Sequence, residues 1–258
     1  MMDADGLLKL FRVSVKECIA SSRSVAVAYS GGVDSAVVER VAREFASTKA
    51  YTCAVRGSHD HARAPLMAAE SGVDLRLVDL DRHGLVELVG KACRVLGTDD
   101  PLRVAYSVPI LCVIDACEEA VLLVGSGADE LFGGYAKYLD HEDPESAMVS
   151  DIKKMQMENE LLREYAKSVG KELGAPFVSE ALVSFARGLP TARKLGGGER
   201  KIVLREAAKA LGVLSYDAPK KAAQYSSGVM REMRRMSKEE GKELRAWTAE
   251  AAKGRRIP

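Results

Sequence analysis

The chain has 258 residues, of which 29% are charged and 47% hydrophobic, and its formal net charge is +1. These values are typical of one large globular domain, or of one domain with a smaller appendage. No apolar run approaches the roughly 20 residues that cross a bilayer, and the first residues lack the pattern of a secretory signal. The near-zero charge gives no general attraction for nucleic acid. We therefore expect a cytoplasmic protein without membrane contact and do not expect a nucleic-acid partner.

The cysteines and histidines do not form a metal-binding pattern. Five cysteines are an odd number and contain no C-x-x-C pair, which argues against a disulfide framework or a zinc ribbon. Buried thiols are the favoured interpretation, also for Cys112 and Cys117 on a predicted apolar helix. His59, Asp60 and His61 follow a predicted strand, and we interpret them as a loop with a helix cap at Asp60 rather than metal ligands.

Helices and strands alternate along the first half of the chain. The hydrophobic pattern predicts helices over residues 7–20, 35–46, 61–71, 84–96 and 106–116, and strands over residues 24–29, 50–55, 75–80 and 120–124. Such alternation is typical of a parallel sheet with right-handed crossovers, and ligands bind such sheets beyond the carboxyl ends of the strands.

The second half of the chain differs in composition. From residue 142 onward the pattern favours helices without buried strands, and from Arg231 onward nine Lys and Arg residues face five Glu residues. We therefore predict an α/β core over residues 1–145, a helical part over residues 146–230 and a basic helix or tail over residues 231–258.

Residues 30–35, with the sequence SGGVDS, connect the first predicted strand to the helix that follows. Such a turn gathers backbone N–H groups, hydroxyls and the positive end of a helix dipole, which together bind phosphate. The two glycines allow the anion to approach closely. Asp34 would repel phosphate unless a cation lay between them, so its carboxylate indicates Mg²⁺. A plain strand-to-helix turn with a serine cap is the alternative that this hexapeptide leaves open.

A second unusual stretch, residues 125–135 with the sequence GSGADELFGGY, follows the fourth predicted strand. Asp129 and Glu130 are adjacent carboxylates that repel each other, so they require a cation or a hydrogen-bond donor. The stretch is not a dinucleotide fingerprint, because Glu130 stands where the third glycine belongs.

Lys220 and Lys221 add two cations in a polar segment before the last helix. Together with Asp34 and Asp129 they suit a nucleoside triphosphate with Mg²⁺. The kinase and ATPase motif G-x-x-x-x-G-K-S/T is absent from the chain. We therefore infer chemistry at the α-phosphorus, where an acid would displace pyrophosphate and a second nucleophile would then displace AMP.

The SGGVDS stretch resembles the pyrophosphate loop of the N-type ATP pyrophosphatases, a group that includes asparagine, GMP and NAD synthetases and several tRNA-thiolating enzymes. Residues 127–135, GADELFGGY, resemble the signature of one branch, the asparagine synthetase domain. Further matches follow in the same order at residues 57–60, 176–177, 201–205, 221 and 224–226. Residues 189–228 are most similar to asparagine-synthetase-domain-containing proteins. The resemblance covers roughly residues 20–230 and implies an α/β, adenine-nucleotide alpha-hydrolase-like (HUP or Rossmann-like) core with a helical C-terminal part.

The resemblance implies ATP and Mg²⁺ as cofactors and gives roles to individual residues. Pyrophosphate would be bound by Ser30, Gly31, Gly32, Asp34 and Ser35, and Mg²⁺ by Asp34 and Asp129. Adenosine would contact Tyr29 and Val55, with Gly125 near the ribose or the α-phosphate. Lys221, with Lys220 beside it, would neutralise the α-phosphate, and Glu172 would lie near the acyl or amine group.

Departures from the family pattern concern the second substrate. Met2 stands where glutamine-using asparagine synthetases have their cysteine nucleophile, so we expect this chain to use ammonia or a separate glutaminase subunit. Ser126 replaces a Glu and Gly174 replaces an Arg near the aspartyl group of those enzymes. The substrates are therefore expected to be a small carboxylate and ammonia or an amine, with aspartate unassigned, and a homodimer is a candidate assembly.

Our leading hypothesis is an ATP-dependent, AMP-forming amide ligase that resembles asparagine synthetase. A tRNA-modifying adenylating enzyme is the second hypothesis, motivated by the same loop and by the basic C-terminal region, although the paired cysteines of thiolating enzymes are absent. A nucleotide-binding subunit without catalysis of its own is the third.

Overall fold

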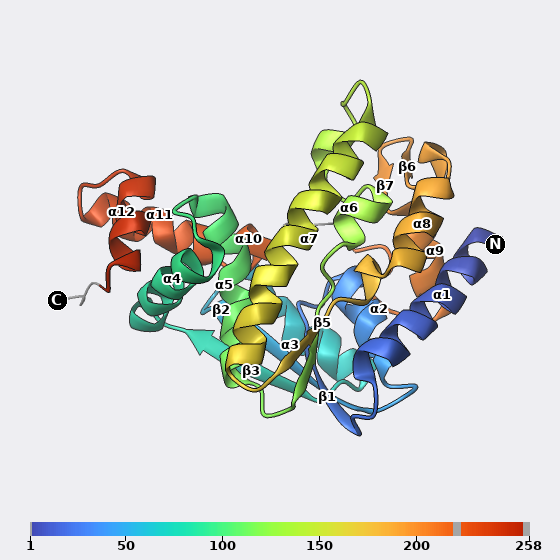
Figure 1. Ribbon diagram of the computed structural model, residues 1–258, viewed down its shortest axis with the longest axis horizontal. Helices are drawn as coiled ribbons and strands as arrows, with labels where there is room; N and C mark the ends of the chain where they lie inside the picture. The colour runs from blue at the N-terminus through green and yellow to red at the C-terminus, as the bar shows by residue number, and fades with distance from the viewer. Residues whose placement is uncertain (1, 219–222, 255–258) are drawn as a thin grey trace.

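The computed structural model describes residues 2–218 and 223–254. Within these residues, helices cover both faces of a five-stranded parallel sheet (Figure 1). Its strands are β1 (Ser24–Ala28), β2 (Ser47–Val55), β3 (Leu75–Leu80), β4 (Val121–Leu123) and β5 (Glu172–Gly174). Their order is β3-β2-β1-β4-β5, and every neighbouring pair is parallel. The predicted α/β class is confirmed, and the order is that of a Rossmann-like sheet.

The helices connect and follow these strands. They are α1 (Met2–Ile19), α2 (Val33–Ala42), α3 (His59–Ser71), α4 (Arg82–Leu96), α5 (Pro101–Ala116), α6 (Ala128–Phe132), α7 (Pro144–Ser168), α8 (Glu180–Gly188), α9 (Ile202–Ala210), α10 (Ala223–Ser226), α11 (Val229–Glu239) and α12 (Leu244–Ala252). Short 3-10 turns are η1 (Ala136–Tyr138), η2 (Pro176–Val178) and η3 (Thr191–Arg193), and β6 (Leu195–Gly196) pairs with β7 (Glu199–Arg200) in a hairpin. Within the described ranges, no helix is long and apolar enough to cross a membrane.

Apolar cores lie on both faces of the sheet, because successive side chains of a strand point to opposite faces. Val25 and Val27 of β1 pack in the core that also holds α1, α2, α8 and α9. Ala26, between them, packs in the other core with α4, α5, α11 and α12. Leu123 and Leu122 of β4 divide in the same way. Burial on both faces explains why these strands are almost entirely apolar.

Strand β5 corrects the expectation that no buried strand follows residue 142. Its three residues pair with β4 in the register Val121–Glu172, Leu122–Leu173 and Leu123–Gly174. A strand this short, with one large apolar side chain, has no alternation that a sequence pattern could reveal. The helical second half of the chain therefore supplies a strand to the sheet of the first half.

Gly174 of β5 occupies a position without room for a side chain. A Cβ atom there would lie 2.7 Å from Leu123 Cδ2 and 2.8 Å from Cys18 Cβ on α1. Gly174 thus faces α1, and the close approach of this helix to the sheet leaves no room for a side chain at this position.

We predict that Gly174→Ala lowers the free energy of unfolding by about 1–3 kcal/mol, because the added methyl group overlaps Leu123 and Cys18. Urea denaturation monitored by circular dichroism would measure the change. Gly188→Ala is the matched control, since a Cβ at Gly188 meets no atom of the described residues within 4 Å. Equal midpoints for both variants and the wild type would contradict the close packing of α1 on β5.

Candidate active site

The SGGVDS stretch forms the turn from β1 into the start of α2. Gly32 precedes the helix in an extended conformation, and no described side chain caps the helix start. Inside the turn, Ser35 Oγ accepts a hydrogen bond from the Ser30 N–H (3.1 Å) and donates one to the Gly32 carbonyl (3.2 Å). The hydroxyls hold the turn, while the first backbone N–H groups of α2 and its dipole form an anion-binding point.

Two glycines allow neighbouring elements to pack against this loop. Gly31 has a φ of +71°, and a Cβ there would lie 3.2 Å from Met67 Cγ on α3. A Cβ on Gly125, just after β4, would lie 3.2 Å from Asp34 Cβ. Larger residues at either position would push α3 or the end of β4 away from the loop.

Lys201 is a buried cation between two carboxylates that come from distant parts of the chain. Its Nζ lies 2.6 Å from both carboxylate oxygens of Asp34 and 2.6 Å from Asp129 Oδ1. The lysine side chain is only 1% exposed, and its backbone has a φ of 60° at the start of α9. Residues other than glycine rarely adopt this left-handed conformation. Sequence reasoning assigns Lys201 no role in the site, although this lysine opens the matched stretch of residues 201–205 and is the signal that could have identified it.

Gly134 leaves the space that this ion pair needs. A Cβ at Gly134 would lie 1.9 Å from Asp129 Oδ1 and 2.3 Å from Lys201 Cε. The second glycine of the GGY sequence is therefore required by the charged cluster, which we define as Asp34, Asp129 and Lys201.

Asp34 and Asp129 fit a magnesium ion. The Lys201 ammonium lies within 2.6 Å of both carboxylates, so a single cation can touch both. Mg²⁺ prefers oxygen ligands and usually keeps waters and phosphate oxygens beside one or two carboxylates. Among the described residues, no group of three or more His, Cys, Asp or Glu could hold a metal ion alone. The pair therefore suits an ion that arrives with phosphate, and it stays the predicted magnesium pair.

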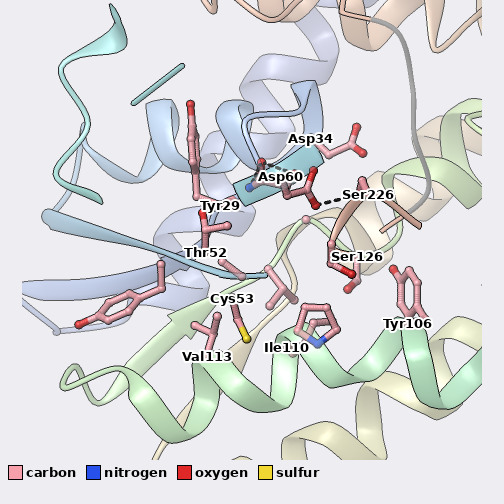
Figure 2. Close-up of a pocket in the computed structure, with 18 of the residues that line it drawn as sticks. Tyr29, Asp34, Thr52, Cys53, Asp60, Tyr106, Ile110, Val113, Ser126 and Ser226 are labelled. Carbon is pink, nitrogen blue, oxygen red and sulfur yellow. Dashed lines mark hydrogen bonds between the residues drawn. The ribbon is translucent and has the colours of Figure 1, made fainter. Parts of the chain in front are cut away.

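A cavity with one polar and one apolar side lies next to the loop (Figure 2). Six residues predicted from the sequence line it: Tyr29, Ser30, Asp34, Ser35, Gly125 and Asp129. Tyr106, Ile110 and Val113 of α5 form the apolar side. Because the cavity lies where β1, β2 and β4 end, it occupies the ligand position that such sheets favour. We call it the nucleotide cavity, since its apolar side suits a base and its polar side suits phosphates.

A smaller polar recess adjoins the nucleotide cavity and is lined by Gly32, Lys201 and Arg63. Arg63 of α3 was missed by the sequence interpretation. Its Nε lies 3.4 Å from the Gly31 carbonyl oxygen and its Nη2 lies 3.5 Å from Met67 Sδ. Within the described residues it takes part in no ion pair, so its guanidinium is only weakly bound beside the loop of residues 30–35.

Arg205 lines the same recess but has a different role. Its Nε donates to the Arg200 carbonyl (2.8 Å), Nη1 to the Tyr216 carbonyl (2.7 Å) and Nη2 to the Ala218 carbonyl (3.0 Å). These bonds hold the chain that follows α9, so we interpret Arg205 as a structural residue.

Val55 does not line the nucleotide cavity, although the resemblance gave it an adenosine contact. Its backbone N–H donates to the Ser227 carbonyl (2.9 Å), which covers the end of β2. From β2 the structure places Thr52 and Cys53 in the cavity wall instead. The predicted contact of Val55 with adenosine therefore stays a prediction.

Glu172 is also separated from the cavity. It is exposed and begins β5, whereas the cavity lies at the carboxyl ends of the parallel strands. We therefore do not carry Glu172 into the functional proposal. Lys220 and Lys221 lie outside the described residues, and their predicted contact with phosphate stays a prediction.

Asp60 connects α3 to the C-terminal helices. Ser226 Oγ donates a hydrogen bond of 2.8 Å to Asp60 Oδ2 (Figure 2). The expected cap at Asp60 is wrong, because Ser58 caps α3 by accepting the His61 N–H (3.3 Å). Ser226 and Ser227 line the nucleotide cavity, so this contact helps to build its wall.

Glu130 interacts with a different side chain from the adjacent Asp129. Burial, together with the adjacent Asp129 carboxylate, raises the pKa of Glu130 to about 7. Tyr135 donates a hydrogen bond of 2.7 Å to its Oε1. The two adjacent carboxylates thus obtain the predicted partners: a cation, Lys201, for Asp129 and a donor, Tyr135, for Glu130.

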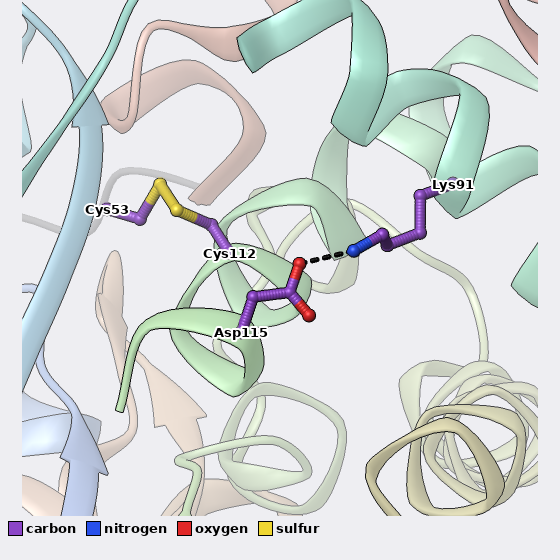
Figure 3. The surroundings of a disulfide bond; sticks show 4 residues. All are labelled: Cys53, Lys91, Cys112 and Asp115. Carbon is purple, nitrogen blue, oxygen red and sulfur yellow. Dashed lines mark hydrogen bonds and ion pairs between the residues drawn. A yellow bond between two sulfur atoms is a disulfide. The ribbon is translucent and has the colours of Figure 1, made fainter. Parts of the chain in front are cut away.

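A disulfide joins Cys53 of β2 to Cys112 of α5 beside the cavity (Figure 3). The expectation of free thiols is wrong for this pair. Their Cα atoms lie 6.2 Å apart although 59 positions separate them, and only the packing of α5 on the sheet brings them together. In the described structure Cys18, Cys93 and Cys117 are free, and burial raises the pKa of each thiol.

Comparisons with known proteins agree on one family. The chain matches the family model of asparagine synthase over residues 6–169 and 140–253. "Putative asparagine synthetase (glutamine-hydrolyzing) 1" of Methanocaldococcus jannaschii is 26% identical over 192 residues, 70% of this chain and 36% of that protein. "Asparagine synthetase domain-containing protein CG17486" of Drosophila melanogaster is 33% identical over 89 residues, 29% of this chain and 15% of that protein. The match thus spans a minor part of each relative's length.

Among solved structures, the NMN synthetase from Francisella tularensis resembles this chain with a TM-score of 0.48 and 12% identity. The superposition covers 99% of this chain and 97% of the other.

We predict that Lys201→Met destabilises the ligand-free protein by about 3 kcal/mol, because two largely buried carboxylates lose the cation between them. Urea denaturation would measure the loss. Lys9→Met, at an exposed position of α1, is the control and should change little. Millimolar magnesium chloride should stabilise Lys201→Met more than the wild type, because the ion can take the vacated place. Unchanged stability in Lys201→Met would show that the charged cluster does not depend on this lysine.

Proposed function

Because the chain belongs to the asparagine synthase family, we propose that it is an ATP-dependent, AMP-forming ligase that joins a carboxylic acid to ammonia or an amine. One observation carries the proposal. The loop of residues 30–35, with its helix start, lies beside the charged cluster of Asp34, Asp129 and Lys201 at the edge of the nucleotide cavity. Donors and cations for phosphate and carboxylates for Mg²⁺ are the groups that such a reaction requires.

In the proposed first step, a carboxylate oxygen of the acid attacks the α-phosphorus of ATP. The bond from that phosphorus to the oxygen bridging to the β-phosphate breaks, and pyrophosphate leaves with its electron pair. In the second step, the nitrogen lone pair attacks the acyl carbon, the bond to AMP breaks, and the nitrogen releases a proton to solvent. Neither step forms a bond to the protein, so the protein contributes positioning and charge neutralisation.

The described residues divide these tasks between them. The N–H groups at the start of α2, with Ser30 and Ser35, would bind the β- and γ-phosphates that leave as pyrophosphate. Mg²⁺, when bound, would be held by Asp34 and Asp129 and would supply positive charge against the phosphates. The apolar face of α5 would hold the base.

Arg63 is the further cation that we assign to the pyrophosphate end. It lines the same recess as Lys201 and makes only weak contacts with Gly31 and Met67, so its guanidinium can turn to a phosphate without breaking a strong bond. A planar guanidinium can donate two parallel hydrogen bonds to phosphate oxygens.

Two arginines of the basic C-terminal region, which motivates the alternative of a tRNA-modifying enzyme, are paired with carboxylates. In α11, Arg235 lies 3.1 Å from Glu232 and 3.3 Å from Glu239, and in α12, Arg245 lies 2.7 Å from Asp99. These arginines are balanced by carboxylates, whereas binding to nucleic acid requires uncompensated positive charge.

We predict that the protein releases AMP and pyrophosphate in equal amounts from ATP when Mg²⁺, ammonium and a suitable acid are present. The measurement is AMP and pyrophosphate formation with a panel of carboxylic acids that includes aspartate. Asp129→Asn should lower the rate by roughly 10²–10³, because it removes a charge that holds the metal and the phosphates. Formation of AMP that does not depend on aspartate or ammonium would exclude asparagine synthesis. Binding of ATP without any AMP would instead indicate a non-catalytic subunit.

We predict that Arg63→Ala weakens binding of ATP and of pyrophosphate by roughly 10- to 100-fold and leaves binding of AMP unchanged, since AMP lacks the phosphates that Arg63 would contact. Isothermal titration calorimetry with Mg²⁺ present would measure the three affinities. Arg63→Lys should restore part of the loss. Arg40→Ala, on the outer face of α2, is the control. Equal weakening of ATP and AMP would mean that Arg63 acts on the whole site rather than on the pyrophosphate.

A further inference from the structure

A second cavity adjoins the nucleotide cavity. It lies between the first half of α5, the α6 region and α7, and its volume is about 620 Å³. Tyr106 and Tyr135 line both cavities, so the two spaces meet at these side chains. We call it the tyrosine groove and define it by Leu102, Tyr106, Tyr135, Met155 and Tyr225.

The tyrosine groove has an apolar and aromatic part, formed by its five defining side chains, which are a leucine, a methionine and three tyrosines. The rest of its lining is charged: Arg103, Glu130, Lys137, Asp151, Lys154 and Glu158. Leu102 is 49% exposed and Tyr225 is 53% exposed, which are high values for large side chains of this kind. Cavities of a few hundred cubic ångströms with aromatic and apolar walls are typical sites for small organic ligands.

The cations around the groove are already paired with carboxylates, and the remaining carboxylate, Glu130, accepts a hydrogen bond from Tyr135. Arg103 Nε lies 2.6 Å from Glu158 Oε1, Lys137 forms an ion pair with Asp151, and Lys154 lies 3.5 Å from the same aspartate. Each cation of the described wall therefore has a carboxylate partner within the wall. A second carboxylate, such as that of aspartate, therefore finds no unpaired cation in the described wall, whereas an apolar group needs none.

The groove opens toward the place where the acid would be activated. Asp129 and Glu130 are consecutive residues of α6, and Asp129 faces the nucleotide cavity while Glu130 lines the groove. Ser126, where the resemblance places a glutamate in asparagine synthetases, is a small residue that lines the nucleotide cavity close to Tyr106 (Figure 2). A carboxylate on a group held in the groove would thus extend between Tyr106 and Tyr135 toward Asp129.

We propose that the tyrosine groove binds the organic part of the carboxylic acid substrate, and that this acid carries a bulky apolar or aromatic group. The inference rests on the proposed function, because the acid is activated in the neighbouring cavity. It assigns the groove to the acid rather than to the nitrogen donor, since ammonia needs no apolar wall.

The binding test uses 3-phenylpropanoate and aspartate as probes, with saturation-transfer NMR on the full chain in the presence of saturating AMP. We expect 3-phenylpropanoate to bind together with AMP and aspartate to bind at least tenfold more weakly. Leu102→Glu, at the groove mouth, should weaken 3-phenylpropanoate at least tenfold through lost apolar contact and charge repulsion. Met157→Glu is the matched control, because Met157 is 71% exposed on α7 and does not line the groove.

Displacement of 3-phenylpropanoate by AMP, failure to bind it, or equal effects of Leu102→Glu and Met157→Glu would overturn the inference. A second measurement, exchange of labelled pyrophosphate into ATP, distinguishes a failure of this inference from a failure of the proposed function. Exchange that depends on 3-phenylpropanoate and is abolished by Leu102→Glu would support both. Exchange with aspartate but not with 3-phenylpropanoate would overturn the substrate class and leave the ligase function intact, whereas no exchange with any acid would overturn the ligase function itself.

Discussion

The site depends on one electrostatic constraint, which is that Asp34 and Asp129 are held close together in a largely buried position. Two such carboxylates repel each other strongly unless a cation lies between them. Lys201 provides that cation from a third segment of the chain, with a left-handed backbone conformation that only a surrounding structure can maintain. Gly134 leaves the space for it. Because Mg²⁺ would use the same oxygens, ion binding and the position of the lysine are coupled under the proposed function. The Lys201 ammonium group, once replaced by Mg²⁺, would lie beside the phosphates and could neutralise part of their negative charge.

The sequence predicts local features well and long-range contacts poorly, for physical reasons. The four apolar strands and the loop of residues 30–35 were predicted because burial on both sheet faces and a turn into a helix are encoded within a few residues. The contact of Lys201 with Asp34 and the Cys53–Cys112 disulfide depend instead on how distant elements pack. Strand β5 is stabilised by an open sheet edge rather than by its own pattern. A family match gives positions in the sequence but not the direction of a side chain, and neither Val55 nor Glu172 is among the residues that line the nucleotide cavity.

The departures from the family pattern at residues 174 and 126 have different physical meanings. Gly174 faces α1 and leaves no room for any side chain, so it reports on packing. Ser126 lines the nucleotide cavity, where a smaller side chain changes the space available to a substrate. Under the proposed function, only the second departure would affect which substrate fits. The same region opens to the tyrosine groove, so the small side chain and the apolar groove favour the same conclusion, an acid larger and less polar than aspartate.

The C-terminal helices are part of the site even though they contribute no strand to the sheet. The Val55 N–H donates to the Ser227 carbonyl and the Ser226 hydroxyl donates to Asp60, so the segment between α10 and α11 is attached to the end of β2 and to α3. Gly228 fits there because a Cβ would lie 2.8 Å from Ser58 Cβ. Ser226 and Ser227 then complete the wall of the nucleotide cavity. A ligand that contacts Ser226 and Ser227 requires this segment to be attached to β2 and α3. Its binding would therefore stabilise the attached arrangement of the C-terminal helices. Under the proposed function, nucleotide binding and attachment of the C-terminal helices would therefore be thermodynamically linked, and a change at Asp60 would alter both.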